Sequence, residues 1–156
     1  MFKGLSYIAG LVMMVGCTEG TVYHTYRDIG GGGWHREDTL VFPIPGSPTD
    51  EEMTCSLYVG MRITSRYPYA DVSIETEEIW DSLVVRLDTV VVSFLGDNGD
   101  IGGRGIRVLQ FEQPVRAITL RPSSKGELRI RHVMRRESLP HISDCGIRIQ
   151  GPPTKQ

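Results

Sequence analysis

Residues 53–63 read MTCSLYVGMRI, and this stretch decides the fold class. Apolar side chains occupy every second position, while polar residues, a tyrosine and a glycine stand between them. Successive side chains of a strand point to opposite faces of the sheet, so the alternation indicates a β-strand with one buried side. The set predicted to be buried is Met53, Cys55, Leu57, Val59, Met61 and Ile63.

The same alternation continues in both directions from this stretch, and no window of useful length shows helical periodicity. After the Tyr67-Pro68 break we expect a strand with Ala70, Val72 and Ile74 facing the core and Glu75 and Glu77 facing solvent. The segment Trp80-Asp81-Ser82 should turn it. Further strands are expected around residues 22–26, 39–44, 83–94, 117–120, 128–134 and 145–149.

One predicted strand changes phase along its length. Leu83, Val85 and Leu87 share one phase, whereas Val90, Val92 and Phe94 share the other. An inserted residue moves side chains to the opposite face of a sheet, so we predict a β-bulge near Asp88.

About eight short strands predict an all-β fold, an antiparallel two-sheet β-sandwich of jelly-roll or immunoglobulin-like type, with a closed barrel as the alternative. Pro43 and Pro45 cannot donate ladder hydrogen bonds, so the strand that contains Pro43 is expected at a sheet edge. The remaining length fits one domain, residues 22–150, followed by a flexible tail at 151–156.

The first sixteen residues read as a cleaved signal peptide. Lys3 is followed by an apolar stretch too short to cross a bilayer. Met14-Val15-Gly16-Cys17 looks like a lipobox, so cleavage between Gly16 and Cys17 and a covalent lipid on Cys17 are expected, with residues 17–21 as the tether. Thr18 is not the aspartate that commonly retains lipoproteins at the inner membrane, which favours the outer membrane facing the periplasm over surface exposure.

Charge is distributed unevenly along the chain. Residues 18–100 hold 5 basic and 15 acidic side chains (−10), whereas residues 101–156 hold 11 basic and 4 acidic ones (+7). The favoured interpretation is cross-strand pairing between early acids and late bases. The alternative is a basic face offered to an acidic partner or anionic lipid, built from Arg129, Arg131, Arg135, Arg136 and Arg148.

Several short motifs, in order, resemble the gliding motility lipoprotein GldH family of the Bacteroidetes. They are Val22-Tyr23 with Tyr26, the glycine run into Trp34, Asp38-Thr39, Tyr67-Pro68-Tyr69, Asp88-Thr89, Gly102 to Ile106, His132-Val133-Met134-Arg135, and Asp144-Cys145-Gly146-Ile147-Arg148-Ile149. The departures are a short loop around Trp80 and Cys145 in place of a valine. The resemblance implies an envelope lipoprotein associated with gliding or with the secretion machinery that shares its components. It brings no catalytic residue, and His132, Met134, Arg135, Asp144 and Gly146 are expected to be structural.

His132 lies in phase with Leu128, Ile130 and Met134, on the apolar face of its strand. A buried histidine needs a hydrogen-bond partner, and Asp144 is the candidate. We therefore expect a structural role for His132 rather than a role as ligand or acid-base group.

Two other residue groups leave alternatives open. Cys55 and Cys145 both fall on predicted inward faces, where they form either a disulfide or two buried thiols. Four aromatic residues near loops either fill the core or form a platform for a glycan or a protein partner. These are Trp34, Tyr67, Tyr69 and Trp80.

No spacing of histidines beside a carboxylate predicts a metal, no nucleophile elbow or phosphate loop occurs, and no nucleic-acid partner is expected. The chain is therefore predicted to be a non-catalytic binding subunit that contacts other envelope proteins, with no cofactor apart from the lipid. A glycan-binding sandwich is the alternative function.

Overall fold

The computed structural model describes residues 20–153; the predicted signal peptide and Cys17 lie outside this range. Within it the chain forms strands, turns and loops, and no helix there is long and apolar enough to cross a membrane. The strands are β1 (Thr21–Asp28), β2 (Trp34–His35), β3 (Leu40–Ile44), β4 (Met53–Thr64), β5 (Asp71–Trp80), β6 (Leu83–Ser93), β7 (Val108–Leu120), β8 (Gly126–His132), β9 (Ser138–Leu139) and β10 (Ile142–Gln150).

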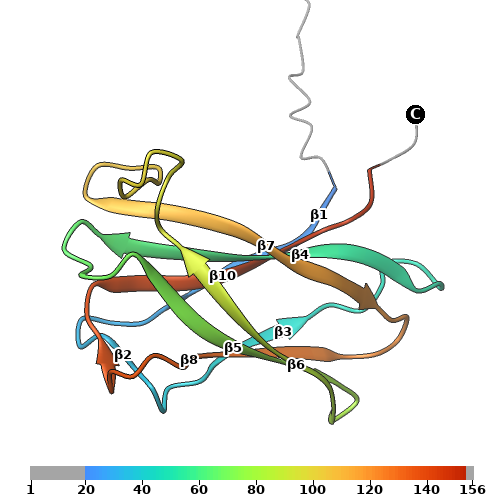
Figure 1. Ribbon diagram of the computed structural model, residues 1–156. Coiled ribbons are helices and arrows are strands. Elements are labelled where there is room, and N and C mark those ends of the chain that lie inside the picture. Colours follow the sequence, from blue (N-terminus) through green and yellow to red (C-terminus); the bar gives the residue numbers. More distant parts are fainter. Residues whose placement is uncertain (1–19, 154–156) are drawn as a thin grey trace, which may run out of the picture.

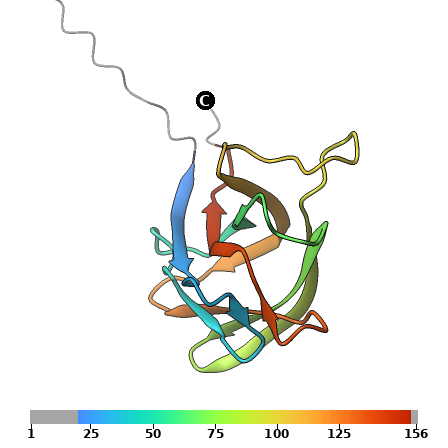
Figure 2. The ribbon, with the colours of Figure 1, turned by 90° about the vertical axis from the view of Figure 1, so that its left-hand side faces the viewer.

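Eight of these strands form two antiparallel sheets that face each other, in the orders β1-β10-β4-β7 and β3-β8-β5-β6 (Figures 1 and 2). Numbered 1 to 8 along the chain, the same strands lie in the orders 1-8-3-6 and 2-7-4-5, which is the jelly-roll arrangement. The prediction of a two-sheet sandwich is thus confirmed, and the strand order selects the jelly roll. The two-residue strands β2 and β9 pair separately.

The core lies between the sheets and is supplied by the inward phase of each strand. In β4 the predicted inward residues Cys55, Leu57, Val59, Met61 and Ile63 are all buried, at 3% exposure or less. The strand is central in its sheet, between β10 and β7, which fits its long apolar row. Pro43 lies in β3, and β3 is an edge strand, as predicted.

The β5–β6 hairpin departs from the sequence prediction at three places. Ala70, expected inside, is exposed and precedes β5. The bulge lies at Val85, because Glu78 pairs with Arg86 and the next residue, Ile79, pairs with Val84. Asp88, where the bulge was predicted, pairs regularly with Thr76.

The apolar side chains at the start of β6 are exposed. Leu83, Val85 and Leu87 are 70%, 45% and 58% exposed, so they do not form the second inward row that their alternation suggested. The physical reason for Leu87 is the register, because it lies opposite Glu77, in the outward phase of β5. Leu83 and Val85 lie at the start of an edge strand, where no further strand covers them. Val92 and Phe94, at its other end, are fully buried.

Strand β7 is longer than predicted, since it begins at Val108 instead of 117 and pairs with the whole of β4. The glycine-rich segment before it contains the isolated bridges Leu95–Ile101 and Arg104–Gln110. The two described ends of the chain meet: Gly151 N donates to Gly20 O at 2.7 Å, so β1 starts where β10 ends (Figure 1).

Candidate binding surfaces

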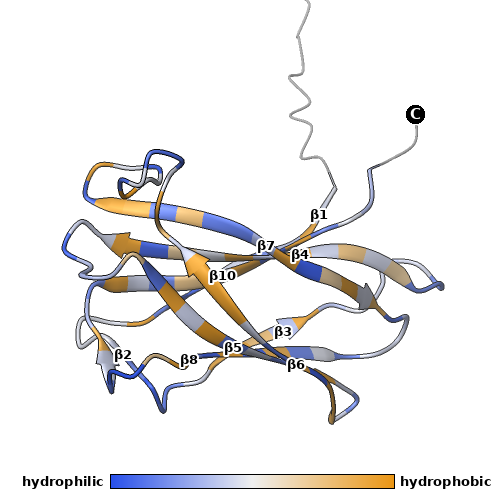
Figure 3. Ribbon diagram, in the orientation of Figure 1, coloured by the Kyte–Doolittle hydropathy of each residue, from blue (hydrophilic) through white to orange (hydrophobic). Residues whose placement is uncertain are grey.

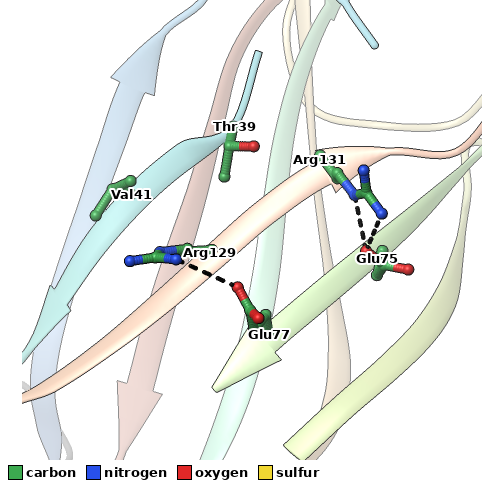
Figure 4. Close-up of a pocket in the computed structure, with 6 residues that line it drawn as sticks. All are labelled: Thr39, Val41, Glu75, Glu77, Arg129 and Arg131. Carbon is green, nitrogen blue, oxygen red and sulfur yellow. Dashed lines mark hydrogen bonds and ion pairs between the residues drawn. The ribbon is translucent and has the colours of Figure 1, made fainter. Parts of the chain in front are cut away.

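A hollow of about 470 Å³ lies on the outer face of the sheet β3-β8-β5. Figure 4 shows its lining, with arginines of β8 between glutamates of β5 and two residues from β3 and the turn before it. The lining residues are Thr39, Val41, Glu75, Glu77, Arg129 and Arg131.

Both glutamates of this hollow are neutralised by the strand beside them. Glu75 and Glu77 are directly opposite Arg131 and Arg129 in the β5–β8 register. Arg131 Nη2 lies 2.6 Å from Glu75 Oε1, and Arg129 Nη1 lies 3.6 Å from Glu77 Oε2. The hollow is thus lined by cross-strand ion pairs at the solvent-facing surface of the sheet.

Charge pairing between early and late strands, the favoured interpretation of the sequence, is confirmed. Arg129 and Arg131 come from the basic half of the chain and Glu75 and Glu77 from the acidic half. The alternative of one basic face is wrong, because Arg148 lies in the other sheet and pairs with Glu112 there. An antiparallel sandwich that interleaves early and late strands brings opposite charges together and leaves no continuous cationic surface.

A second ionic cluster is buried at the side of the sandwich where β6 and β7 are the two edge strands. Arg116 of β7 places Nη1 2.7 Å from Glu78 Oε2 and Nε 3.1 Å from Asp88 Oδ2. Glu78 Oε1 accepts the Trp80 Nε1 hydrogen at 2.7 Å, and Arg86 Nε donates to Asp88 Oδ2 at 2.6 Å. The Arg116 and Glu78 side chains are each only 8% exposed.

This cluster was not predicted from the sequence, although the sequence holds a signal for it. Glu78 continues the inward phase of Val72 and Ile74, and Arg116 that of Ile118 and Leu120. A charged residue in the inward phase of two different strands indicates a buried ion pair.

Exposed apolar side chains are concentrated in one part of the chain, from the start of β6 to the start of β7. Of eleven exposed large hydrophobic residues in the described range, nine lie between Leu83 and Val108. We call these nine the apolar edge; Figure 3 colours much of β6 as hydrophobic. Its members are Leu83, Val84, Val85, Leu87, Val91, Leu95, Ile101, Ile106 and Val108.

The aromatic residues near loops belong to the core, the first of the two alternatives, and do not form an exposed platform. Trp34, Tyr67 and Trp80 are exposed by 3% or less, and Tyr69 packs edge-on against Tyr67 at 5.6 Å between ring centroids. Tyr67 also contacts Phe94. Trp34, Tyr67 and Trp80 belong to the main core cluster, and Tyr69 packs against it.

His132 is fully buried in β8, on the apolar face as predicted, but its partner is not Asp144. Its Nε2 donates to the Trp34 carbonyl oxygen at 3.0 Å, and the two rings pack edge-on at 5.4 Å. Asp144 lies in the opposite sheet, in the outward phase of β10. Burial lowers the pKa of His132, and its Nδ1 has no hydrogen-bond partner in the described chain.

The other residues of the family-like motifs occupy structural positions. Met134 Sδ accepts the Ser73 N–H at 3.3 Å, and its carbonyl oxygen accepts from Arg36 at 2.5 Å. Gly146 lies beneath the Tyr26 ring, and a Cβ there would be 2.6 Å from both Tyr26 Cδ1 and the Thr25 carbonyl oxygen. Arg135 is exposed.

Cys55 and Cys145 are both free, buried thiols. Cys145 is directly opposite Met61, six residues from Cys55 along β4. At about 3.3 Å per residue the two cysteines are roughly 20 Å apart, well beyond the reach of a disulfide. The disulfide that the sequence left open therefore does not form in this structure, and burial raises the pKa of both thiols.

The fold and these surfaces define a class: a jelly-roll domain with cross-strand ion pairs, whose exposed apolar residues are concentrated in β6 and in the segment that leads from it to β7. A family model described as GldH lipoprotein matches residues 21–149, nearly all of this domain. The chain belongs to the GldH lipoprotein family. It is thus a member of a lipoprotein family involved in gliding motility and associated with the cell envelope.

Comparisons with individual proteins agree with the family. The chain is 23% identical over 150 residues to the gliding motility lipoprotein GldH of Flavobacterium johnsoniae, covering 89% of this chain and 90% of that protein.

Two solved structures also cover 85% of this chain, namely dimeric latent PorU from Porphyromonas gingivalis and a CocE/NonD family hydrolase from Staphylococcus aureus. Each has a TM-score of 0.35, with 10% and 8% identity, and this chain spans 13% and 32% of their lengths.

Proposed function

We propose that this lipoprotein is a non-catalytic binding subunit of the gliding motility machinery, or of the protein secretion machinery associated with it. In this proposal a lipid on Cys17 holds the domain at the outer membrane, facing the periplasm. The domain then acts by contacting other envelope proteins, and the tether raises its effective concentration for partners at that membrane.

The observation that carries the proposal is the apolar edge. Scattered surface hydrophobics are ordinary, but nine of eleven in one part of the chain are not scattered. Ile106 is 96% exposed and Leu83 is 70% exposed. Exposed apolar residues that gather along an unpaired sheet edge mark protein contact sites or aggregation hazards.

The ionisable groups of the described chain support a binding role in place of catalysis. The hollow on the outer face of β3-β8-β5 holds carboxylates that pair with arginines at its surface. His132 is fully enclosed between the sheets and donates to a backbone carbonyl, so it has no access to a substrate.

The proposal is tested by replacing two residues of the apolar edge together, Leu87→Lys with Ile106→Lys. Both side chains are exposed by more than half, so we expect the purified domain to melt within a few degrees of the parent. In a strain that lacks the native gene, the double variant should fail to restore colony spreading or secretion, because two charges oppose the apolar contact.

Val133→Lys is the matched control, since Val133 is 38% exposed and lies outside the apolar edge. It should restore function fully. A double variant that restores spreading and secretion as well as this control would refute a binding role for the edge.

A further inference from the structure

β6 and β7 are edge strands of the two different sheets. Their free edges are in contact near the end of β6 and are separated by a notch near its start. Near the end of β6, the Gln113 side chain of β7 donates Nε2 to Val91 O at 2.9 Å and accepts the Ser93 N–H at 3.3 Å. The amide thus takes the place of a neighbouring strand there. In an antiparallel strand the N–H and C=O of one residue point to the same side, and this side alternates from each residue to the next. The N–H and C=O groups of Thr89 and Leu87 therefore point to the same free edge as those of Val91 and Ser93.

The first half of β6 has no such cover and borders a notch of about 240 Å³ between the two edge strands. Three arginines contribute to its lining: Arg86 of β6, Arg116 of β7 and Arg121, which follows β7. The other lining residues are Glu78, Val85, Ala117, Ile118 and Thr119.

The notch is short of acceptors. Its three arginines face two carboxylates, Glu78 and Asp88, which leaves one positive charge. Arg116 Nη2 is buried without a hydrogen-bond partner in the described chain, in a side chain that is 8% exposed. Arg121 lies over the Trp80 ring at 5.8 Å and forms no ion pair with the described residues. Buried donors without acceptors are costly, so the notch suits an incoming anion.

The surroundings of the notch specify what carries that anion. Val85 lines the notch, and Leu83, Val84 and Leu87, in the same half of β6, are exposed by 56% to 70%. A small free anion would leave this apolar row uncovered. An extended peptide covers it, because a strand added to a sheet edge offers backbone hydrogen bonds and alternating side chains at once.

A second copy of the chain is a poor occupant. If two β6 strands paired edge to edge, each would offer one carboxylate, Asp88, which Arg86 and Arg116 already hold. The free charge of the notch requires a carboxylate from a different sequence.

Resting on the binding role proposed above, we propose that an extended segment of a partner protein adds to the free edge of β6 and places an Asp or Glu carboxylate in the notch between β6 and β7. Its apolar side chains cover Leu83, Val85 and Leu87, while Arg86 and Arg121 hold the carboxylate from the rim.

The test uses the full-length lipoprotein in cells, with a photo-cross-linking amino acid in place of Leu87. The same amino acid in place of Val41, on the edge strand β3 at the opposite side, is the control. We expect a discrete adduct from position 87 only. Mass spectrometry of that adduct should identify a strand-like partner segment with an Asp or Glu within a few residues of the cross-link.

The charge of the notch is tested by Arg121→Glu in the position-87 protein, with Arg66→Glu as a matched control, because Arg66 is exposed and outside every ion pair of the described chain. Arg121→Glu should lower the adduct yield about tenfold or more, whereas Arg66→Glu should leave it unchanged. Arg121→Met keeps the stem against Trp80 and should lower the yield less. A synthetic peptide of the cross-linked segment should bind the purified domain about tenfold more weakly after Glu→Gln or Asp→Asn replacement.

Three outcomes would overturn the inference. If Arg121→Glu leaves the adduct yield unchanged, the notch does not recognise a carboxylate, although the proposed binding role is unaffected. If the adduct contains a second copy of this chain, the segment bound at β6 does not come from a partner protein. Adducts from Val41 and not from Leu87 move the contact to the other edge, which again leaves the wider binding role intact.

Discussion

At the scale of single residues, His132 couples protonation to folding. It is fully buried, and burial lowers the pKa of its imidazole below the ordinary value of 6.5. The unfolded chain, with an ordinary histidine, therefore binds a proton at a higher pH than the folded chain does. The contribution of this residue to stability is complete above about pH 6.5 and falls as the pH drops from there towards the folded pKa.

We predict that the free energy of unfolding falls between pH 7.5 and pH 5.5, and that His132→Gln flattens this slope. Glutamine can still donate to the Trp34 carbonyl but does not titrate in this range. Urea titrations at several pH values measure the effect. His24→Gln, at an exposed position of β1, is the control and should keep the parent slope; a parent slope that survives in His132→Gln would show that other groups cause it.

At the scale of the elements, β1, β10 and β4 are packed closely around one aromatic ring. Tyr26, Gly146 and Gly60 are directly opposite one another across the three strands. The Tyr26 ring lies over both glycines, and the Arg62 guanidinium stacks on it at 4.0 Å from the ring centroid. The glycines thus serve to make room for this ring, and their lack of a side chain is compensated by its cover.

Gly60→Ala should destabilise the domain by about 1–3 kcal/mol, because its Cβ would overlap the Tyr26 hydroxyl and ring. All three nearest atoms belong to Tyr26, so the cost should largely disappear in a Tyr26→Ala background. Thermal or urea unfolding of the four proteins of this cycle measures the coupling.

Gly31→Ala, where a Cβ would meet nothing within 4 Å, is the neutral control. Additive costs for Gly60→Ala and Tyr26→Ala would disprove the packing role of the ring.

At the scale of the whole molecule, the jelly-roll order places the two described ends of the chain side by side, where Gly20 bonds to Gly151. The described chain therefore begins and ends at the same end of the sandwich, and Gly20 belongs to neither β6 nor the segment that leads from it to β7. In the proposed function, the tether joins the domain at Gly20 and the partner binds at the apolar edge, so the anchor and the binding surface use different parts of the chain.

Cys17→Ser should leave the precursor uncleaved and reduce colony spreading or secretion far more than it changes the fold. A serine hydroxyl does not take the thioether-linked lipid on which signal cleavage depends. Intact-mass analysis of the membrane fraction measures cleavage and acylation, and circular dichroism of the soluble domain checks the fold. Normal processing and full function of this variant would exclude the lipid anchor.

The sequence alone was sufficient to predict features that depend only on the order of residues within one strand. The period-two rows of β4 and β8, the proline of the edge strand β3 and the family motifs each depend on local order along the chain. Those rows show which face of a strand is apolar because side chains alternate whatever the neighbours are. The charge asymmetry of the two halves likewise predicted pairing between early and late strands.

Tertiary structure decided whatever depends on which strands are neighbours. The apolar pattern of β6 looks like a buried strand, and only its register with β5 and its place at a sheet edge leave Leu83, Val85 and Leu87 in water. Two inward cysteines look able to pair, and only the β4–β10 register separates them. Likewise Arg116 and Glu78, 38 positions apart, meet because β5 and β7 come from different sheets that face each other. Alternation fixes the side of a strand, whereas strand order and register fix what covers it.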